Sequence, residues 1–225
     1  MRSPVPALAL VCALLLSTQG ALADDRPRSL EAQLLHLRPN LSEIEIWNRA
    51  ARTWQPLAVP RGKVLVVHLW ARSCLPCLKE FPLLARLAKS WAAQPDVVPL
   101  FVADGPEEMT RAKVEEFWQH PYVDLPGENC PGQTARLPGS GSRCPLDVPE
   151  LDPARTRSPR LGRELNAQVK PLTLFIDPRG FVRQAFVGSI AERAHEVTAS
   201  LERLLRAVAS ERTGSASGPA HPRKS

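Results

Sequence analysis

Several features that the sequence lacks exclude whole classes of protein. Among its 225 residues, no uninterrupted apolar run approaches the roughly 20 residues of a membrane-spanning helix. No internal repeat is present, and a composition with 44% hydrophobic and 23% charged residues excludes collagen-like, coiled-coil and wholly disordered chains. The net charge of +6 is spread thinly and forms no basic block of the kind that binds nucleic acid. The length and apolar content fit one ordinary domain with appendages.

The N-terminal segment 1–23 has the layout of a secretory signal. Arg2 precedes a short apolar stretch, Val5–Leu16, and small residues follow a polar break just before Asp24. Because signal peptidase requires small residues at its cleavage site, we expect cleavage before Asp24 and export to the periplasm or out of the cell. Retention as an uncleaved membrane anchor is the alternative, although the apolar stretch is short for that.

Loss of this segment removes Cys12 and leaves four of the five cysteines in an oxidising compartment. Four thiols allow three complete pairings. Cys74 and Cys77 are close enough in sequence for a local redox pair, whereas Cys130 and Cys144 flank a loop-like insert and favour a structural disulfide. Such a crosslink stabilises the folded state by about 3 kcal/mol because it restricts the denatured chain. A second redox relay that hands electrons to the first pair is the alternative.

Apolar patterns predict strands and helices in alternation. Glu43–Trp47 alternates like an exposed edge strand, and Val64–Trp70 is a nearly continuous β-branched run typical of a buried central strand. The later patterns predict, in chain order, a helix over Pro76–Trp91 bent at Pro82, a strand over Asp96–Val102, a helix over Glu107–Gln119, a hairpin of Leu172–Asp177 with Phe181–Val187, and a helix over Ala191–Ala209. Helical crossovers followed by a hairpin and a closing helix predict an α/β protein with a central mixed β-sheet flanked by helices.

The segments around this core have their own composition. Residues 24–40 form an N-terminal extension with a short helical pattern, and the domain itself is expected over 41–209. An insert over about 124–160 is too rich in Pro and Gly for regular structure over most of its length. Residues 210–225 are rich in Ser, Gly and Pro, which predicts a disordered tail.

The strongest local signal is the C-x-x-C motif of Cys74 and Cys77, at the boundary between the buried strand and a helix. A thiolate there faces backbone N–H groups without partners and the positive end of the helix dipole, and both lower the pKa of a thiol. We therefore expect Cys74 to be the accessible nucleophile and Cys77 the buried resolving thiol of thiol–disulfide exchange. A structural bridge and half of a zinc site are the alternatives. Zinc would require a second comparable pair or a His-x-His partner, so no metal or cofactor is expected.

Two segments resemble the signatures of exported thioredoxin-like proteins of the TlpA/ResA type. They are Val64–Pro82, which contains both cysteines of the motif, and Val169–Gly180. The resemblance covers about Glu43–Arg206 and implies a thioredoxin-like fold, with the Pro/Gly-rich insert ahead of the strand that follows a cis-proline. It further implies an oxidoreductase that reduces protein disulfides, such as those of apocytochrome c or copper-site thiols, and that draws on a membrane or periplasmic electron donor, with no nucleic-acid partner.

The same resemblance assigns further residues to the site. Pro171 is implied to be cis and to face the sulfurs, and it would present the backbone of Lys170 to an extended client by strand-like pairing. An ordinary trans proline that opens an edge strand is the alternative. Trp70, Ser73 and Pro76 are implied to line the client-binding surface as well.

Some positions depart from the family and leave alternatives open. His68 stands where thioredoxins carry a buried acid, and since imidazole titrates near neutrality it is a candidate relay for the proton of Cys77. A hydrogen-bonded core histidine with no role is the alternative. Arg72 and Lys170 either add positive charge near the thiolate or are solvated surface groups. Two further functional hypotheses are a copper metallochaperone that uses Cys74, Cys77 and optionally His68 as soft ligands, and a non-catalytic interaction domain.

Overall fold

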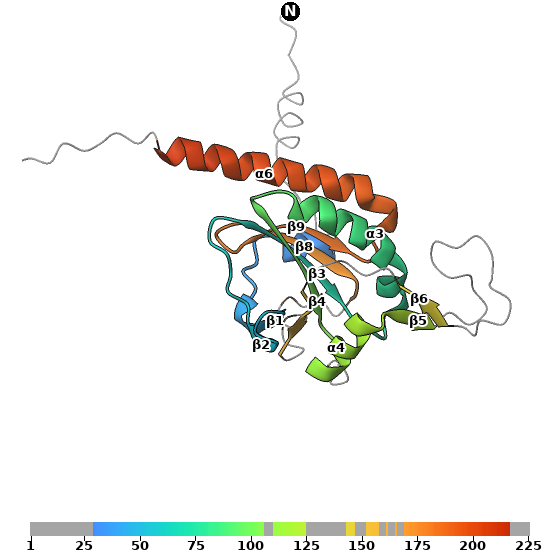
Figure 1. The fold of residues 1–225 in the computed structure, drawn as a ribbon. Helices are drawn as coiled ribbons and strands as arrows, with labels where there is room; N and C mark the ends of the chain where they lie inside the picture. The colour runs from blue at the N-terminus through green and yellow to red at the C-terminus, as the bar shows by residue number, and fades with distance from the viewer. Residues whose placement is uncertain are drawn as a thin grey trace, which may run out of the picture.

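The computed structural model describes residues 29–105, 110–124, 143–146, 152–157, 161, 165 and 169–216. It confirms the predicted fold class, a central mixed β-sheet flanked by helices (Figure 1). The expected signal segment 1–23, Cys130 and most of the expected insert lie outside the described residues. Within the described ranges, no helix combines the length and the apolar character needed to cross a membrane.

The chain alternates strands and helices along its length. The described strands are β1 (Ile44–Asn48), β2 (Thr53–Pro56), β3 (Val64–Trp70), β4 (Val97–Ala103), β5 (Tyr122–Asp124), β6 (Arg143–Pro145), β7 (Ala154–Thr156), β8 (Leu172–Ile176) and β9 (Val182–Val187). The described helices are α2 (Leu30–Leu34), α3 (Leu75–Ala92), α4 (Arg111–Gln119) and α6 (Ala194–Ala216), with 3-10 turns at Leu41–Glu43 and Ala191–Arg193.

Strand β3 is an interior strand of the main sheet, in which seven strands follow the order β2-β1-β7-β4-β3-β8-β9. It pairs in parallel with β4 and in antiparallel with β8, and all seven of its side chains are buried. A β-branched and aliphatic run without polar alternation suits a strand that is covered on both faces. Because β8 runs back along β3, its first residue, Leu172, lies opposite Leu69 near the C-terminal end of β3.

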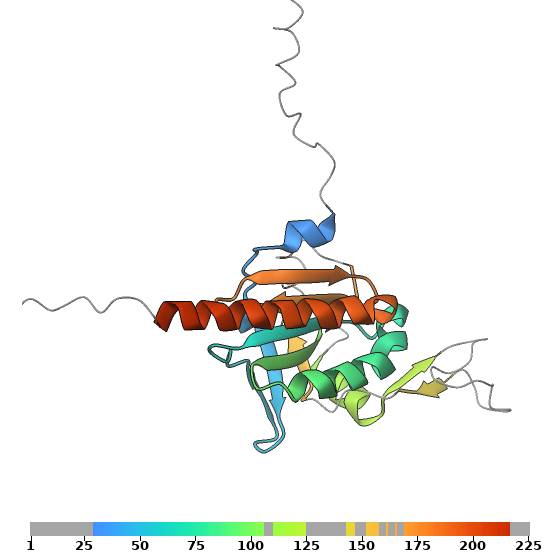
Figure 2. The ribbon, with the colours of Figure 1, turned by 90° about the horizontal axis from the view of Figure 1, so that it is seen from above.

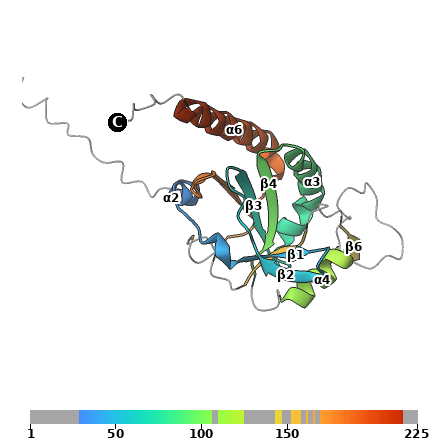
Figure 3. The same cartoon turned by 60° about the vertical axis from the view of Figure 1, so that its left-hand side comes forward.

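Two hydrophobic layers cover the two faces of the sheet. One layer joins α3, α4 and α6 to the sheet through buried residues such as Phe81, Phe117 and Leu201. The other joins α2 to the opposite face through Leu34 and neighbouring aliphatic residues. Figure 3 shows α3 and α6 on one side of the strands and α2 on the other, and Figure 2 shows α6 lying across the sheet with α2 beside β9. The helices that carry the C-x-x-C motif and close the chain thus share one face.

Helix α3 runs without interruption from Leu75 to Ala92. Pro76 occupies its first turn, where a missing N–H group is harmless because no intrahelical acceptor exists for it. Pro82 lies inside the helix, which continues through it rather than ending there. Phe81 and Leu84, on either side of this proline, are fully buried and hold the helix against the sheet.

One prediction about the sheet was wrong. β1 is not an edge strand, because β2 pairs with one of its sides and β7 with the other. Two short strands, Thr53–Pro56 and Ala154–Thr156, were not predicted at all, and the second lies within the Pro/Gly-rich insert. Strands this short carry no readable alternation, so the hydrogen bonds of their neighbours define them.

The last helix extends further than expected. α6 continues to Ala216, although the pattern ended it at Ala209, so the first part of the expected tail is helical. Ion pairs hold this part to the domain: Arg212 donates two hydrogen bonds to Asp96, at 3.1 and 3.2 Å, and Glu211 pairs with Arg179 at 3.3 Å. Contacts with residues distant in the chain therefore stabilise a segment whose own composition favours disorder.

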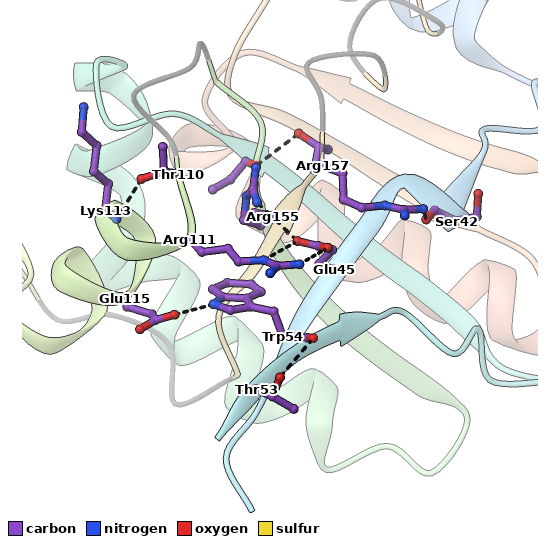
Figure 4. Close-up of polar contacts among 12 residues, drawn as sticks. Ser42, Glu45, Thr53, Trp54, Thr110, Arg111, Lys113, Glu115, Arg155 and Arg157 are labelled. Atoms are coloured by element: carbon purple, nitrogen blue, oxygen red, sulfur yellow. Dashed lines mark hydrogen bonds and ion pairs between the residues drawn. The ribbon is translucent and has the colours of Figure 1, made fainter. Parts of the chain in front are cut away.

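A buried carboxylate fastens α4 to the sheet (Figure 4). Glu45 of β1 is 4% exposed and accepts two hydrogen bonds from Arg111 of α4, at 2.6 and 3.1 Å, and one from Arg155 of β7, at 3.3 Å. The hydrogen bonds of Arg111 hold the pKa of Glu45 below its ordinary value. Next to this cluster, the indole N–H of Trp54 donates to Glu115 of the same helix. The cluster fixes α4, which in turn packs against the helix of the C-x-x-C motif.

We predict that Glu45→Gln lowers the free energy of unfolding by about 2–3 kcal/mol, because it leaves the partly buried guanidinium of Arg155 without its counter-charge. Urea unfolding at neutral pH measures the loss. The control is Asp152→Asn, which breaks an ion pair of Arg49 with both side chains well exposed and should cost less than about 1 kcal/mol. Equal losses in the two variants would contradict the role given to Glu45.

Candidate active site

The C-x-x-C motif forms a disulfide at the start of α3. Cys74 and Cys77 are bonded to each other, which confirms the predicted local pair. Cys74 is half-buried, whereas Cys77 is fully buried. The Cys74 Sγ accepts the backbone N–H of Cys77 at 3.2 Å, so this sulfur caps the helix. Amide groups aimed at a sulfur favour its thiolate once the disulfide is reduced.

A cis-proline lies at the same end of the sheet. The bond between Lys170 and Pro171 is cis, as the family resemblance implied. Pro171 is buried, its carbonyl oxygen accepts the N–H of Gly188 at 2.9 Å, and the next residue begins β8. Because β8 is antiparallel to β3, this proline lies beside the C-terminal end of β3, from which the chain leads through one turn to Cys74.

The residues expected at the client-binding surface differ in exposure. Ser73 and Pro76 are exposed. Trp70 is fully buried, so the expectation that it contacts a client was wrong. Its ring instead packs against an aromatic cluster, which consists of Phe81, Phe117 and Trp118. Trp70 supports the turn before Cys74 from inside the core.

Two exposed apolar side chains, one inside the motif and one just before the cis-proline, were not selected by sequence reasoning. Leu75, between the two cysteines, is 36% exposed, and Val169, two residues before the cis-proline, is 48% exposed. Among the described residues only two other large hydrophobic side chains, Leu37 and Val59, are as exposed. Solvent-exposed apolar groups next to a reactive bond suit contact with another chain.

The two basic residues near the motif are both engaged. The Lys170 ammonium lies 3.1 Å from the carboxylate of Asp104 and is mostly buried. Arg72 donates a hydrogen bond to the Tyr122 hydroxyl at 2.8 Å, and its guanidinium lies 5.6 Å from the centre of that ring. The other terminal nitrogen of the Arg72 guanidinium, Nη1, lies 3.9 Å from the carboxylate of Glu116. The alternative that these are freely solvated surface groups is therefore wrong.

Cys144 lies close to the active-site helix. It is disulfide-bonded and 2% exposed, and it belongs to the same hydrophobic cluster as Cys77. β6 carries it opposite Val123 of β5, next to the Tyr122 that contacts the turn before Cys74. Its expected partner, Cys130, lies outside the described residues, so that pairing and its structural role stay predictions.

A buried polar pair lies between β3 and α3. The Nε2 atom of His68 lies 3.4 Å from the Oε1 atom of Glu80, and neither atom has a hydrogen-bond partner. The other ring nitrogen of His68 lies 3.0 Å from the Thr173 hydroxyl. The second oxygen of Glu80 accepts the Ser189 hydroxyl at 2.6 Å and the Ile190 N–H at 2.9 Å. The pair links the central strand, the active-site helix and the loop before α6.

Burial sets the charge of this pair. It lowers the pKa of His68 to about 3, and it raises the pKa of Glu80 against the hydrogen bonds of Ser189 and Ile190. His68 is therefore neutral at physiological pH, and the imidazole does not titrate near neutrality as expected. Glu80 is the titratable group that sequence reasoning missed. Its position three residues after Cys77, on the apolar stripe of a helix, is the signal that could have identified it.

Nowhere among the described residues do three or more His, Cys, Asp or Glu side chains converge as they would around a metal ion.

Comparison with solved structures concerns the fold of the chain. A proposed thiol:disulfide interchange protein, DsbE, from Chlorobium tepidum matches with a TM-score of 0.51 at 15% sequence identity, over 76% of this chain and 99% of that one. The chain has a thioredoxin-like fold. A thioredoxin-like protein from Porphyromonas gingivalis matches with a TM-score of 0.47 at 15% identity, over 74% and 92% of the two chains. StoA from Bacillus subtilis matches with a TM-score of 0.47 at 14% identity, over 72% and 99%. No protein-family model and no curated protein matches the sequence.

We predict that His68 makes the wild-type protein acid-sensitive. The pKa of His68 is about 3 in the folded protein, against an ordinary value of 6.5. Above pH 6.5 the imidazole is neutral in both states and the free energy of unfolding keeps its full value, and it decreases as the pH falls below 6.5. Below that pH the unfolded chain takes up one more proton, which lowers the free energy of unfolding by about 1.4 kcal/mol per pH unit. Urea unfolding of wild type and His68→Gln between pH 7 and pH 4 measures the difference. Glu80 is present in both proteins, and parallel curves would refute the assignment.

Proposed function

We propose that the chain is an exported thiol–disulfide oxidoreductase of the TlpA/ResA type, with Cys74 as nucleophile and Cys77 as resolving thiol. The observation that carries the proposal is the Cys74–Cys77 disulfide at the start of α3, where one sulfur is half-buried and caps the helix and the other is fully buried. The thioredoxin-like fold supports it, and so do the cis bond at Pro171 and the exposed residues around the motif. Export rests on the sequence of segment 1–23.

The exchange proceeds in two displacement steps. In the reducing direction, the Cys74 thiolate attacks one sulfur of a client disulfide, the client S–S bond breaks, and the second client sulfur leaves as a thiolate and takes up a proton. The Cys77 thiol then loses its proton and attacks the Cys74 sulfur, and the first client sulfur leaves. Two electrons pass to the client, and the enzyme ends in the disulfide form that the structure holds. A membrane or periplasmic dithiol donor restores the reduced form.

Glu80 is the group we assign to the proton of Cys77. The two residues are three positions apart on α3 and both are almost fully buried, so their side chains share the inner face of the helix. Because burial raises the pKa of Glu80, its carboxylate is a stronger base than an ordinary carboxylate and accepts the proton of Cys77 more readily. His68, which stays neutral, is then a positioning residue that faces the Oε1 atom of Glu80.

The protein clients would be exported proteins with disulfides or reactive thiols, such as apocytochrome c or the thiols of copper sites. The direction of electron flow follows from the reduction potential of the Cys74–Cys77 pair. A potential near about −270 mV would make the protein a reductant, and one near about −120 mV an oxidant. Equilibration with glutathione or dithiothreitol buffers measures this potential.

We predict that replacement of Cys74 and replacement of Cys77 block different steps of the exchange. Cys74→Ser should lower turnover of a protein disulfide by more than about 1000-fold because no nucleophile remains. Cys77→Ser should instead accumulate a mixed disulfide between Cys74 and the client, since the resolving thiol is lost. Turnover of a disulfide-linked peptide and mass spectrometry of the trapped species provide the measurements. Residual turnover by Cys74→Ser, or trapping on any other cysteine, would refute the proposed roles.

We predict that the exposed apolar side chains next to the motif contribute to client binding. Leu75→Ser and Val169→Ser should each raise KM for a peptide disulfide with apolar flanking residues by about 3- to 10-fold, as expected for the loss of a small apolar contact. KM for a small aliphatic disulfide should rise less. Leu37→Ser and Val59→Ser are matched controls, because those side chains are 38% and 47% exposed and lie outside the site. Equal effects of all four substitutions would contradict this role.

A further inference from the structure

A buried ion pair lies directly before the cis-proline. The Lys170 ammonium is 3.1 Å from the Oδ2 atom of Asp104, and the two side chains are 17% and 1% exposed. The other oxygen of Asp104 accepts the Thr156 hydroxyl at 2.9 Å. Both carboxylate oxygens thus have a partner, and the negative charge has a counter-charge, as a buried ionised carboxylate requires. The exchange mechanism above uses neither residue.

The pair joins the segments that surround the disulfide. Asp104 follows β4 directly, and its backbone N–H donates to the carbonyl oxygen of Trp70, the last residue of β3, at 2.8 Å. Three residues of turn then lead from Trp70 to Cys74, whose N–H donates to Ala71 at 3.0 Å. Lys170 lies on the other side, as the residue whose peptide bond to Pro171 is cis. One ion pair therefore connects the strand ends that lead to the sulfur with the loop opposite it.

We infer that Lys170 and Asp104 form a charge-balanced positioning pair for the exchange reaction. Asp104 draws the Lys170 side chain inward, so that the loop offers its backbone and the apolar Val169 to a client rather than an ammonium group. The opposite charges of the pair cancel each other's effect on the Cys74 thiolate. This inference rests on the proposed function and adds two residues to it.

The physical basis is the Coulomb interaction with a thiolate in a partly buried site. An uncompensated carboxylate there disfavours the thiolate, and an uncompensated ammonium favours it. If the pair only packed against the loop or stiffened it, removal of either partner would shift the pKa of the Cys74 thiol in the same direction. The sign of the shift therefore separates charge balance from simple structural support.

The test is a double-mutant cycle on the reduced protein, with the pKa of Cys74 followed by thiolate absorbance. Lys170→Met should raise the pKa of Cys74 and Asp104→Asn should lower it, each by about 0.5 or more, which is about a threefold change in the ratio of thiolate to thiol. The double variant should return close to the wild-type value. The reduction potential should fall in Lys170→Met and rise in Asp104→Asn, because a less stable thiolate disfavours the reduced form.

A matched pair at the other end of β8 provides the control. Asp177 follows the last residue of that strand, is 3% exposed, and lies 2.7 Å from Arg183. Asp177→Asn and Arg183→Met should lower stability and leave the pKa of Cys74 unchanged. The other charged groups of the turn and of the first helical turns, which are Arg72, Lys79 and Glu80, are the same in every variant.

Shifts of opposite sign that cancel in the double variant support the inference. Shifts of the same sign in both single variants, or none in proteins that are folded by circular dichroism, overturn it. Should Asp104→Asn fail to fold, Lys170→Met and the charge-conserving Lys170→Arg decide, because only the first should raise the pKa. Turnover of a small disulfide by wild type tests the proposed function separately: if it is absent, that function fails, and if it is present without the shifts, this inference alone fails.

Discussion

The junction between β3 and α3 is the constraint on which the rest of the structure depends. There the chain leaves a strand that is buried on both faces and, after one turn, begins a helix that the Cys74 sulfur caps through the N–H group of Cys77. Helix N-terminal amides have no partner of their own, so a sulfur that accepts one of them gains stability as a thiolate. The aromatic cluster around Trp70 packs beneath this turn, and α4, fastened to the sheet through Glu45, completes that cluster. Core packing thus fixes the position of the reactive atom.

Two buried pairs near this junction handle charge in opposite ways. Between His68 and Glu80, desolvation acts on both groups and favours the neutral form of each, so a proton can move on or off the carboxyl group. Between Lys170 and Asp104, each carboxylate oxygen has a partner, and the carboxylate and the ammonium compensate each other's charge. The His68–Glu80 pair therefore suits proton transfer, and the Lys170–Asp104 pair suits an electrostatic potential at the sulfur that does not change during the reaction.

Long, strongly patterned elements could be predicted from the sequence. The nearly continuous apolar run of β3, the helical stripe of α3 and the β8–β9 hairpin each carry enough residues to show their period. β2 and β7 could not be predicted, because strands of four and three residues depend on the neighbours with which they pair. The prediction for Trp70 failed for a related reason: its place in the motif suggested a surface role, whereas Phe117 and Trp118 of a later helix cover it.

The sequence by itself determined the local chemistry. A C-x-x-C motif between a buried run and a helical period brings one sulfur to the start of a helix and the other to its inner face, because both consequences follow from dihedral geometry within a few residues. Tertiary structure decided which distant side chains meet. Asp104 reaches Lys170, and Glu80 reaches His68 and Ser189, only because β3 is in register with β4 and β8 and because α3 packs on the same face as α6. Local sequence patterns indicate burial and backbone preference. They do not indicate which distant residues come into contact, because only the folded sheet brings those residues together.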